Sequence, residues 1–341
     1  MMPMLDLLAT GPGVSVQDLG RPGHLATGLS TGGAADRRAL FEAAALLGQP
    51  APLACLELAG YGGRFRVGAP TRIALTGAPM RATLDGAPLR WHAAHLLPSG
   101  AVLDIGAVEA GSYGYLSFAG GIATPEILGA RSAHLAAGIG ARLAAGARLP
   151  LGPDTTPGAP LLALPAPARF QGGTVRVIAG PQTAQFPLET RARFFATPFT
   201  AGRGNRQGLA LPPPDAPFAA DAPPNLVSDL IVPGDIQMTG AGGPMVLLCE
   251  CQTIGGYPRI GTVIPADLGI VAQAAPGTIL RFAPVTLDVA EAASPPESRW
   301  IAPLRAQAQP LIRSPHDIPD LLGYQLISGA VRGDEPEEDS P

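Results

Sequence analysis

Residues 250–259 bring together an acid, amide and hydroxyl groups, a bare backbone and an aromatic ring. The polar side chains closely follow the apolar run 245–249, a candidate strand, and two adjacent glycines then let a ligand approach the backbone. These are the ingredients of a pocket for a small polar ligand. A glycine hairpin with a tyrosine packed on a sheet explains the same pattern equally well. The candidate pocket residues of this segment are Glu250, Gln252, Thr253, Gly255, Gly256 and Tyr257.

A second polar group, residues 17–21, lies at the end of another candidate strand and combines an amide, a carboxylate and a guanidinium. These groups belong to Gln17, Asp18 and Arg21. Because loops held by a rigid scaffold often carry function, the group is a candidate for ligand binding or acid–base chemistry. On composition alone, an Asp–Arg pair that caps its own turn is the favoured interpretation.

Residues 31–36 open the clearest candidate helix with two glycines. Backbone N–H groups at such a helix start attract anions, which makes Gly32, Gly33 and Asp36 candidate anion-binding residues. An ordinary helix N-terminus explains them without a ligand, and the sequence alone favours that interpretation. The polar residues 205–207, next to a strand-like segment, are weaker candidates.

The chain contains no lysine, so all 23 basic residues are arginine. A Schiff base, a Walker-type phosphate loop and an attached biotin or lipoyl group all need a lysine amine, and the sequence excludes them for this chain. We therefore expect anions to be held by arginine forks, backbone N–H groups or helix ends. We expect no covalent cofactor.

The spacing of histidines and cysteines does not predict a metal site. Cys55, Cys249 and Cys251 make neither a disulfide framework nor a zinc knuckle. Only His92 and His95 are close in sequence, and in a strand this offset places the two rings on opposite faces. We expect no catalytic metal.

The charge pattern argues against nucleic acid and membranes as partners. The net charge is −4 and no basic block is present. No stretch of about 18 uncharged apolar residues could span a bilayer. The first ten residues lack the basic start of a signal peptide. We expect a cytoplasmic protein.

The elements that must position these groups are mostly short strands. The 44 glycines and 39 prolines punctuate short apolar runs, as turns between strands do. Residues 35–47 form the clearest helix pattern, with Gly48 as its stop. Asp85 and Gly86 predict a hairpin turn. The sequence therefore predicts a mainly β fold with few short helices.

Composition divides the chain into three parts. Residues 150–172, rich in Pro, Ala and Gly, predict a linker, so we expect an N-terminal β domain over 1–165 and a C-terminal β domain over 166–290. Similar glycine intervals in the two parts hint at an internal duplication. In the extension 291–341 the strand pattern fades, and we expect its acidic tail, 333–339, to be disordered.

The order of several motifs resembles the KipA family. They run from G-V-S-V-Q-D-L-G-R through S-x-G-G-x-x-D, F-A-G-G-I, L-G-x-R-S and G-P-Q to a late G-D-I-Q and E-C-Q-T-I-G-G-Y-P, over residues 10–285. The family is also called the C subunit of 5-oxoprolinase, allophanate hydrolase subunit 2 or the biotin-dependent carboxyltransferase family. The resemblance implies two cyclophilin-like β-barrel domains, which agrees with the short strands.

The resemblance also implies a function and partners. It implies the C subunit of an ATP-dependent 5-oxoprolinase, a hydrolase that opens the cyclic amide 5-oxoproline to L-glutamate. The implied partners are a KipI-like protein and a LamB/YcsF-like protein, which share the ATP with this chain. Two alternatives stay open: a carboxyltransferase component of a biotin-dependent urea or amide carboxylase, and a regulator that binds a KipI-like kinase inhibitor.

The polar groups and the resemblance together suggest residue roles. Lactam opening needs cations for phosphate and carboxylate, groups that recognise the amide, and donors for the developing oxyanion. Arg21 and Arg206 are expected to bind anions. The expected amide-binding residues are Gln17, Gln237 and Gln252, the expected oxyanion donors are Gly255 and Gly256, and the expected catalytic residues are Asp18, Glu250 and Gln252.

Overall fold

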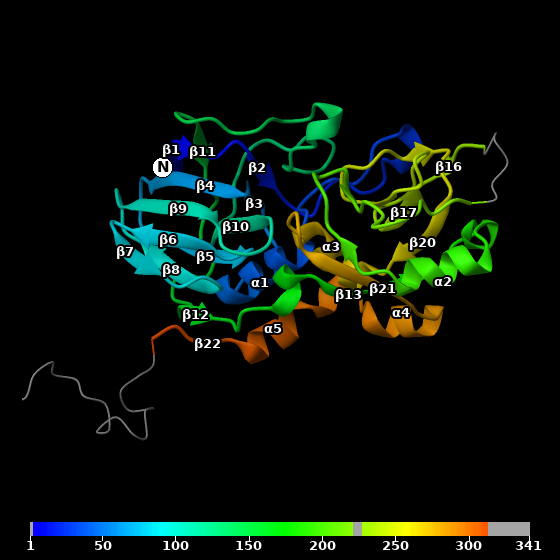
Figure 1. The fold of residues 1–341 in the computed structure, drawn as a ribbon. Coiled ribbons are helices and arrows are strands. Elements are labelled where there is room, and N and C mark those ends of the chain that lie inside the picture. Colours follow the sequence, from blue (N-terminus) through cyan, green and yellow to red (C-terminus); the bar gives the residue numbers. More distant parts are fainter. Residues whose placement is uncertain (1–2, 221–226, 313–341) are drawn as a thin grey trace, which may run out of the picture.

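Short strands of the first half of the chain, joined by one strand from residues 309–310, form two sheets (Figure 1). The computed structural model describes residues 3–220 and 227–312. The first sheet has the order β11 (Arg148–Pro150), β1 (Met4–Thr10), β4 (Tyr61–Val67), β9 (Val102–Val108), β6 (Met80–Leu84) and β7 (Ala87–Leu89). The second has the order β2 (Val14–Gln17), β3 (Cys55–Ala59), β10 (Tyr113–Phe118), β5 (Thr71–Gly77), β8 (Ala93–Leu97), β12 (Leu162–Ala163) and β22 (Gln309–Pro310).

The two sheets enclose one apolar core. Leu5 and Phe65 of the first sheet and Leu56 and Ile73 of the second are completely buried in the same cluster. The longer strands of the first sheet bury one face, whereas β3, β5 and β10 of the second sheet are buried on both faces. We call this part of the molecule the first unit.

A third sheet forms the second unit. Its order is β14 (Phe199–Thr200), β21 (Ile279–Pro284), β13 (Gly173–Ile178), β20 (Arg259–Val263), β17 (Asp235–Met238), β18 (Pro244–Leu247) and β15 (Gly208–Ala210). Only β13 and β21 pair in parallel; the other pairs are antiparallel. Phe194, Phe199 and Phe282 are in mutual ring contact in its core. A two-stranded ribbon, β16 (Asp229–Leu230) with β19 (Ile254–Gly255), lies beside this sheet.

Few helices cover these sheets. The longest, α1 (Arg37–Leu47), packs against β5 and β8 of the first unit through alanines and leucines. In the second unit, α2 (Leu188–Ala196) packs on β21, and α3 (Leu268–Gln273) lies against β13 and β15. The prediction of a mainly β fold with few short helices is confirmed.

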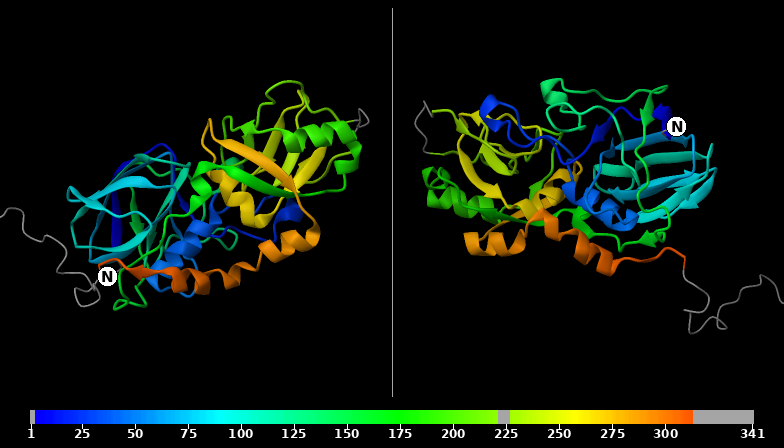
Figure 2. Two further views of the ribbon diagram at one scale, coloured as in Figure 1. Left: turned by 60° about the horizontal axis from the view of Figure 1, so that its bottom comes forward. Right: turned by 180° about the vertical axis from the view of Figure 1, so that it is seen from behind.

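The C-terminal segment crosses both units. It contains α4 (Leu287–Ala293), α5 (Ile301–Gln307) and β22, and Figure 2 shows it running along one side of the molecule. The first helix contacts β13 of the second unit, the second packs on α1, and β22 pairs with β12 of the first unit. Within the extension that begins at residue 291, the described part up to residue 312 is thus mainly helical, with one short strand. The acidic tail lies outside the described residues.

Two local predictions are confirmed. The helix α1 begins two residues later than predicted and ends at Gly48, which has a φ of 74° and donates its N–H to the Ala44 and Ala45 carbonyls. Asp85 and Gly86 have φ angles of 49° and 88° and join β6 to β7, as the hairpin turn requires.

The predicted linker is partly structured. It contributes β12 to the second sheet, and its Asp154 forms an ion pair with Arg72. The domain boundaries at residues 165 and 290 stay a prediction.

In the described residues no helix has the length and apolar character to cross a membrane.

Candidate functional site

A buried guanidinium joins the two units. Arg206, between β14 and β15, donates from Nε to Glu250 Oε1 at 2.6 Å, and its terminal nitrogens donate to Glu57 Oε1 and to the Gly33 carbonyl. Burial lowers the pKa of Arg206, but the neighbouring carboxylates outweigh burial and hold this pKa well above its usual value. Arg206 therefore ties the second unit to β3 and to the start of α1.

The same network continues to the start of α1. Glu57 Oε2 accepts hydrogen bonds from the Ala35 N–H and the Tyr115 hydroxyl, both at 2.8 Å. The Tyr115 oxygen in turn accepts the Asp36 N–H at 2.8 Å. The residues before the helix are thus fixed by β3 and β10, and the helix start lies at the junction of the units.

One hollow at this junction is polar. It has a volume of about 380 Å³, and we call it the polar cleft. Among its lining residues are Tyr113, Ala136, Arg142, Asn205, Arg206 and Glu250. An adjoining hollow of about 430 Å³ shares Tyr113 and Asn205 and adds Arg203. Arg142 and Arg203 are exposed and form no ion pair within the described residues.

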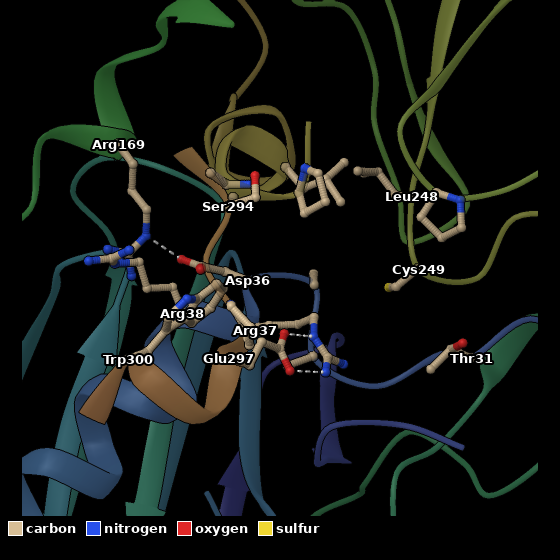
Figure 3. A pocket seen from close by; sticks show the side chains of 18 of the residues that line it. Thr31, Asp36, Arg37, Arg38, Arg169, Leu248, Cys249, Ser294, Glu297 and Trp300 are labelled. Carbon is tan, nitrogen blue, oxygen red and sulfur yellow. Dashed lines mark hydrogen bonds and ion pairs between the residues drawn. The ribbon is translucent and has the colours of Figure 1, made fainter. Parts of the chain in front are cut away.

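A second hollow at the junction is mainly apolar. It has a volume of about 460 Å³, and we call it the apolar cavity (Figure 3). The start of α1 and Arg169 form one side, Leu248 and Cys249 lie opposite, and residues 294–297 with Trp300 complete the wall. The cavity thus contacts both units and the C-terminal segment.

Ion pairs fix the charged wall of the apolar cavity. Arg169 Nε donates to Asp36 Oδ2 at 2.7 Å, and its terminal nitrogens form a fork with Glu42. Arg37 forms a second fork with Glu297, at 2.6 and 2.7 Å (Figure 3). Both forks join α1 to segments far away in sequence.

The acids Glu250 and Asp18 both have fixed partners. Burial raises the pKa of Glu250, but Arg206 and backbone N–H groups outweigh burial, so this pKa lies below its usual value and the group is ionised at neutral pH. Glu250 Oε2 accepts the Ala136 N–H at 3.0 Å. Asp18 accepts the N–H groups of Gly20 and Arg131 at 2.8 and 2.6 Å. Both acids hold backbone segments in place, and their catalytic roles stay predictions.

Arg21 is buried without a carboxylate partner in the described residues. It is 1% exposed and donates to the carbonyls of Ser132 and Ile127, while Nη1 has no partner. Burial lowers its pKa, and the charges of Asp18 and Glu250 oppose this effect. Arg21 lines neither the polar cleft nor the apolar cavity, and its predicted role in anion binding remains untested.

Ser30 and His134 form a buried pair near Arg21, with 2.9 Å between Ser30 Oγ and His134 Nε2. His134 Nδ1 accepts the Ala137 N–H at 3.2 Å, so in the neutral ring the proton is on Nε2 and points at the serine. Burial lowers the pKa of His134, which keeps the ring neutral. The histidine therefore donates to the serine and is not oriented to activate it as a nucleophile.

Residues 252–257 line neither the polar cleft nor the apolar cavity. Ile254, in β19, pairs with Leu230 of β16, and its side chain is 62% exposed. Gln252 is exposed, Thr253 is buried, and Tyr257 borders a separate hollow. Ile254 and Gly255 pair with β16 and so do not form a hairpin within the segment, which was one of the two interpretations of the sequence. The predicted ligand contacts of these residues, Gly256 included, remain untested.

The two remaining predicted amide groups are buried. Gln17 Nε2 donates to Ser15 and to the Ala133 carbonyl, while Oε1 has no partner. Gln237 lies in β17, and its Nε2 has no partner either. A β-carbon at Gly255 would lie 2.8 Å from this nitrogen, so the glycine permits the close approach of the Gln237 side chain.

The sequence pointed to the start of α1, Arg206 and Glu250, and the structure brings these together. The sequence analysis did not identify four further residues that complete the junction, namely Glu57, Tyr115, Arg169 and Gln273. Glu57 had one signal, because an acid in the middle of the apolar strand 55–59 needs a partner. Gln273 Nε2 donates to Asp36 Oδ2 at 2.9 Å, a contact over 237 positions that no local pattern predicts.

The described residues hold no group of three or more potential metal ligands. Burial raises the pKa of the Cys249 thiol to about 11 and that of the Cys251 thiol to about 12. Neither thiol is therefore an activated nucleophile at neutral pH.

The comparisons with known proteins give one consistent family. The model of the carboxyltransferase domain, subdomain A and B, matches residues 27–284. The chain is 32% identical to the C subunit of 5-oxoprolinase from Escherichia coli (strain K12), over 88% of this chain and 97% of that protein. It is 28% identical to the C subunit of 5-oxoprolinase from Haemophilus influenzae, over 84% of this chain and 93% of that protein.

Solved structures show the same fold within longer chains. The K. lactis urea amidolyase superimposes with a TM-score of 0.77 at 28% identity, over 85% of this chain and 19% of that chain. The Kluyveromyces lactis urea carboxylase superimposes with a TM-score of 0.75 at 28% identity, over 85% of this chain and 28% of that chain. This chain therefore corresponds to a minor part of each of these two proteins.

Proposed function

Because the chain belongs to the carboxyltransferase domain family, subdomain A and B, we propose that it is the C subunit of a cytoplasmic, ATP-dependent 5-oxoprolinase. The observation that carries the proposal is the 32% identity to the Escherichia coli C subunit over 97% of that protein. The chain acts together with two partner proteins, one KipI-like and one LamB/YcsF-like. Its substrate is 5-oxoproline and its product L-glutamate.

The reaction needs ATP because an amide is a poor electrophile. Phosphorylation of the amide oxygen activates the ring carbon, and water adds to it. The C–N bond breaks as the nitrogen takes up a proton, and a second water hydrolyses the resulting acyl phosphate to carboxylate and phosphate. Such a sequence creates anions at every stage, so cations and oriented N–H donors stabilise it.

The polar cleft has groups that suit these anions. Arg142 and Arg203 are exposed at the cleft and its adjoining hollow, without ion pairs in the described residues, and so are free to bind phosphate. Arg206 is already neutralised by Glu57 and Glu250, so in this proposal it keeps the cleft in shape. The partner proteins complete the site and share the nucleotide.

The test is reconstitution with the KipI-like and LamB/YcsF-like partners, followed by measurement of ATP-dependent glutamate release from 5-oxoproline. Exchanging Arg142 and Arg203 together for Gln should lower kcat/KM by at least about tenfold, because each arginine removed takes away a charge-assisted hydrogen bond. Arg64→Gln, an exposed arginine paired with Asp104 in the first unit, is the matched control and should leave turnover unchanged. A complex that releases glutamate equally well without this chain would contradict the proposal.

Carboxyl transfer is the second candidate, and the family and the likeness to urea amidolyase favour it. Since the chain has no lysine, the biotin would be attached to another chain. Avidin distinguishes the two functions. It should abolish a carboxyl transfer that uses biotin and leave 5-oxoproline hydrolysis unchanged.

A further inference from the structure

The apolar cavity contains an acceptor that nothing in the described chain satisfies. Asp36 Oδ2 accepts from Arg169 Nε at 2.7 Å and from Gln273 Nε2 at 2.9 Å, whereas Oδ1 has no donor. The residue is completely buried and lines the cavity. A buried carboxylate oxygen without a donor destabilises the fold, so its presence in a cavity wall suggests that a ligand supplies the donor.

The position of Asp36 explains why Oδ1 is free. It is the N-cap residue of α1, but its side chain does not cap the helix and is drawn to Arg169 and Gln273 instead. Gly269 lies next to Oδ1, and a β-carbon at Gly269 would be 3.2 Å from this oxygen. The glycine therefore keeps bulk away from the unsatisfied acceptor.

The helix start adds donors that lack acceptors. The first N–H groups of a helix have no partner within the helix. Those of Arg37 and Arg38 have no acceptor among the described residues, and both residues line the cavity. With 11 residues, α1 is long enough for its dipole to favour an anion at this end.

The cavity also has one cation without an ion pair. Arg37 and Arg169 are each held in a fork by an acid, whereas Arg38 forms no ion pair within residues 3–220 and 227–312. Its guanidinium lies over the Trp300 ring at 5.6 Å from the centroid. Leu248, Pro295 and Pro296 supply apolar surface in the same cavity.

These features define the chemistry of one ligand. We propose that the apolar cavity binds a small carboxylic acid that carries an N–H donor next to an apolar ring, as a cyclic amide acid does. The N–H donates to Asp36 Oδ1, the carboxylate accepts from the N–H groups of Arg37 and Arg38, and the ring lies against Trp300 and the prolines. The proposal rests on the proposed function, because it assigns the substrate's own chemical class to this cavity, whereas the polar cleft is proposed to bind phosphate.

The two tryptophans of the chain provide a binding assay without turnover. Trp300 lines the cavity, whereas Trp91 donates to the Gly77 carbonyl in the first unit. In the full chain carrying Trp91→Phe, 5-oxoproline should change the emission of Trp300 in a saturable way. Cyclopentanecarboxylic acid, which has the ring and the carboxylate but no N–H, should bind at least about tenfold more weakly, since it leaves the acceptor unsatisfied.

Asp36→Asn is the sharpest variant. Arg169 and Gln273 both donate to Oδ2, so an asparagine must place its oxygen there and its NH2 group where Oδ1 was. This exchange replaces the acceptor by a donor, and it should weaken 5-oxoproline binding at least about tenfold while affecting cyclopentanecarboxylic acid little. Gly269→Ala, which crowds Oδ1 but keeps the ion pairs, should weaken 5-oxoproline binding even if Asp36→Asn fails to fold.

Arg64→Gln is the control variant, since it lies away from the cavity. Equal binding of the two acids, no response of Trp300, or unchanged binding in both Asp36→Asn and Gly269→Ala overturns the proposal.

The experiments distinguish a failure of this proposal from a failure of the proposed function. Turnover in the reconstituted complex without a Trp300 response overturns only the assignment of the cavity, and a specific Trp300 response without turnover overturns only the 5-oxoprolinase function.

Discussion

At the scale of single residues, the junction depends on buried charges that neutralise one another. A buried ion pair contributes little to the free energy of folding by itself. Removing one partner is costly, because the other charge stays buried with neither a counter-ion nor water around it. Arg206 has two such partners, Glu57 and Glu250, both almost fully buried. The arginine is therefore indispensable to the junction even where it contributes nothing to ligand binding.

Arg206→Met should lower the free energy of unfolding by about 3–5 kcal/mol, because it leaves two buried carboxylates unpaired. Adding Glu57→Gln and Glu250→Gln to this variant should recover most of the loss. Urea denaturation of the single and triple variants measures both values. If the triple variant is as unstable as the single one, the carboxylates are not the cause.

At the scale of elements, α1 has a different role at each end. Its C-terminus stops at Gly48 as the local sequence requires, whereas its N-terminus is fixed by β3, β10 and Arg206. The C-terminal segment then covers its outer face, where Trp300 meets Phe41 edge to face at a centroid distance of 5.0 Å. The helix is thus held between a sheet and a segment about 260 residues further along the chain.

Trp300→Ala should loosen α1 without unfolding the molecule. Removal of the indole exposes Phe41 and leaves Arg38 without its aromatic partner. Hydrogen exchange should accelerate in α1 and α5 and stay unchanged in β17 and β20 of the second unit. Leu287→Ala, at an exposed leucine of α4, is the matched control and should not affect exchange in α1. Equal acceleration in both units would show that the segment stabilises the molecule as a whole.

At the scale of the whole molecule, burial of neutral histidines limits stability in acid. Burial and, to a smaller extent, the nearby Arg169 together lower the pKa of His92 to about 4. The unfolded chain takes up this proton near pH 6.5, its usual pKa. His92 therefore contributes stability that is fully present above about pH 6.5 and is lost as the pH falls towards 4.

His92→Gln should remove this loss. Between about pH 6.5 and pH 4, the free energy of unfolding of the native protein should fall more steeply than that of the variant, by about 1.4 kcal/mol per pH unit and about 3 kcal/mol in all. Chemical denaturation at several pH values measures this difference. The two profiles should run parallel between pH 7 and 8, and parallel profiles in acid as well would refute the assignment.

The sequence by itself determined the local features. Turn residues fix the Asp85–Gly86 hairpin, a left-handed glycine ends α1, and apolar alternation gives short strands, because each depends only on neighbours in the chain. The absence of lysine likewise restricts the possible chemistry without any structure.

Only the tertiary structure decided which polar groups meet. Within residues 252–257, which have the composition of a pocket wall, Ile254 and Gly255 pair with β16, and Ile254 is exposed while Thr253 is buried. Asp36 looks like a helix cap, yet Arg169 and Gln273, 133 and 237 positions away, take its carboxylate. Hydrogen bonds and ion pairs act over a few ångströms in space and not along the chain, so the fold alone could place these groups around one cavity.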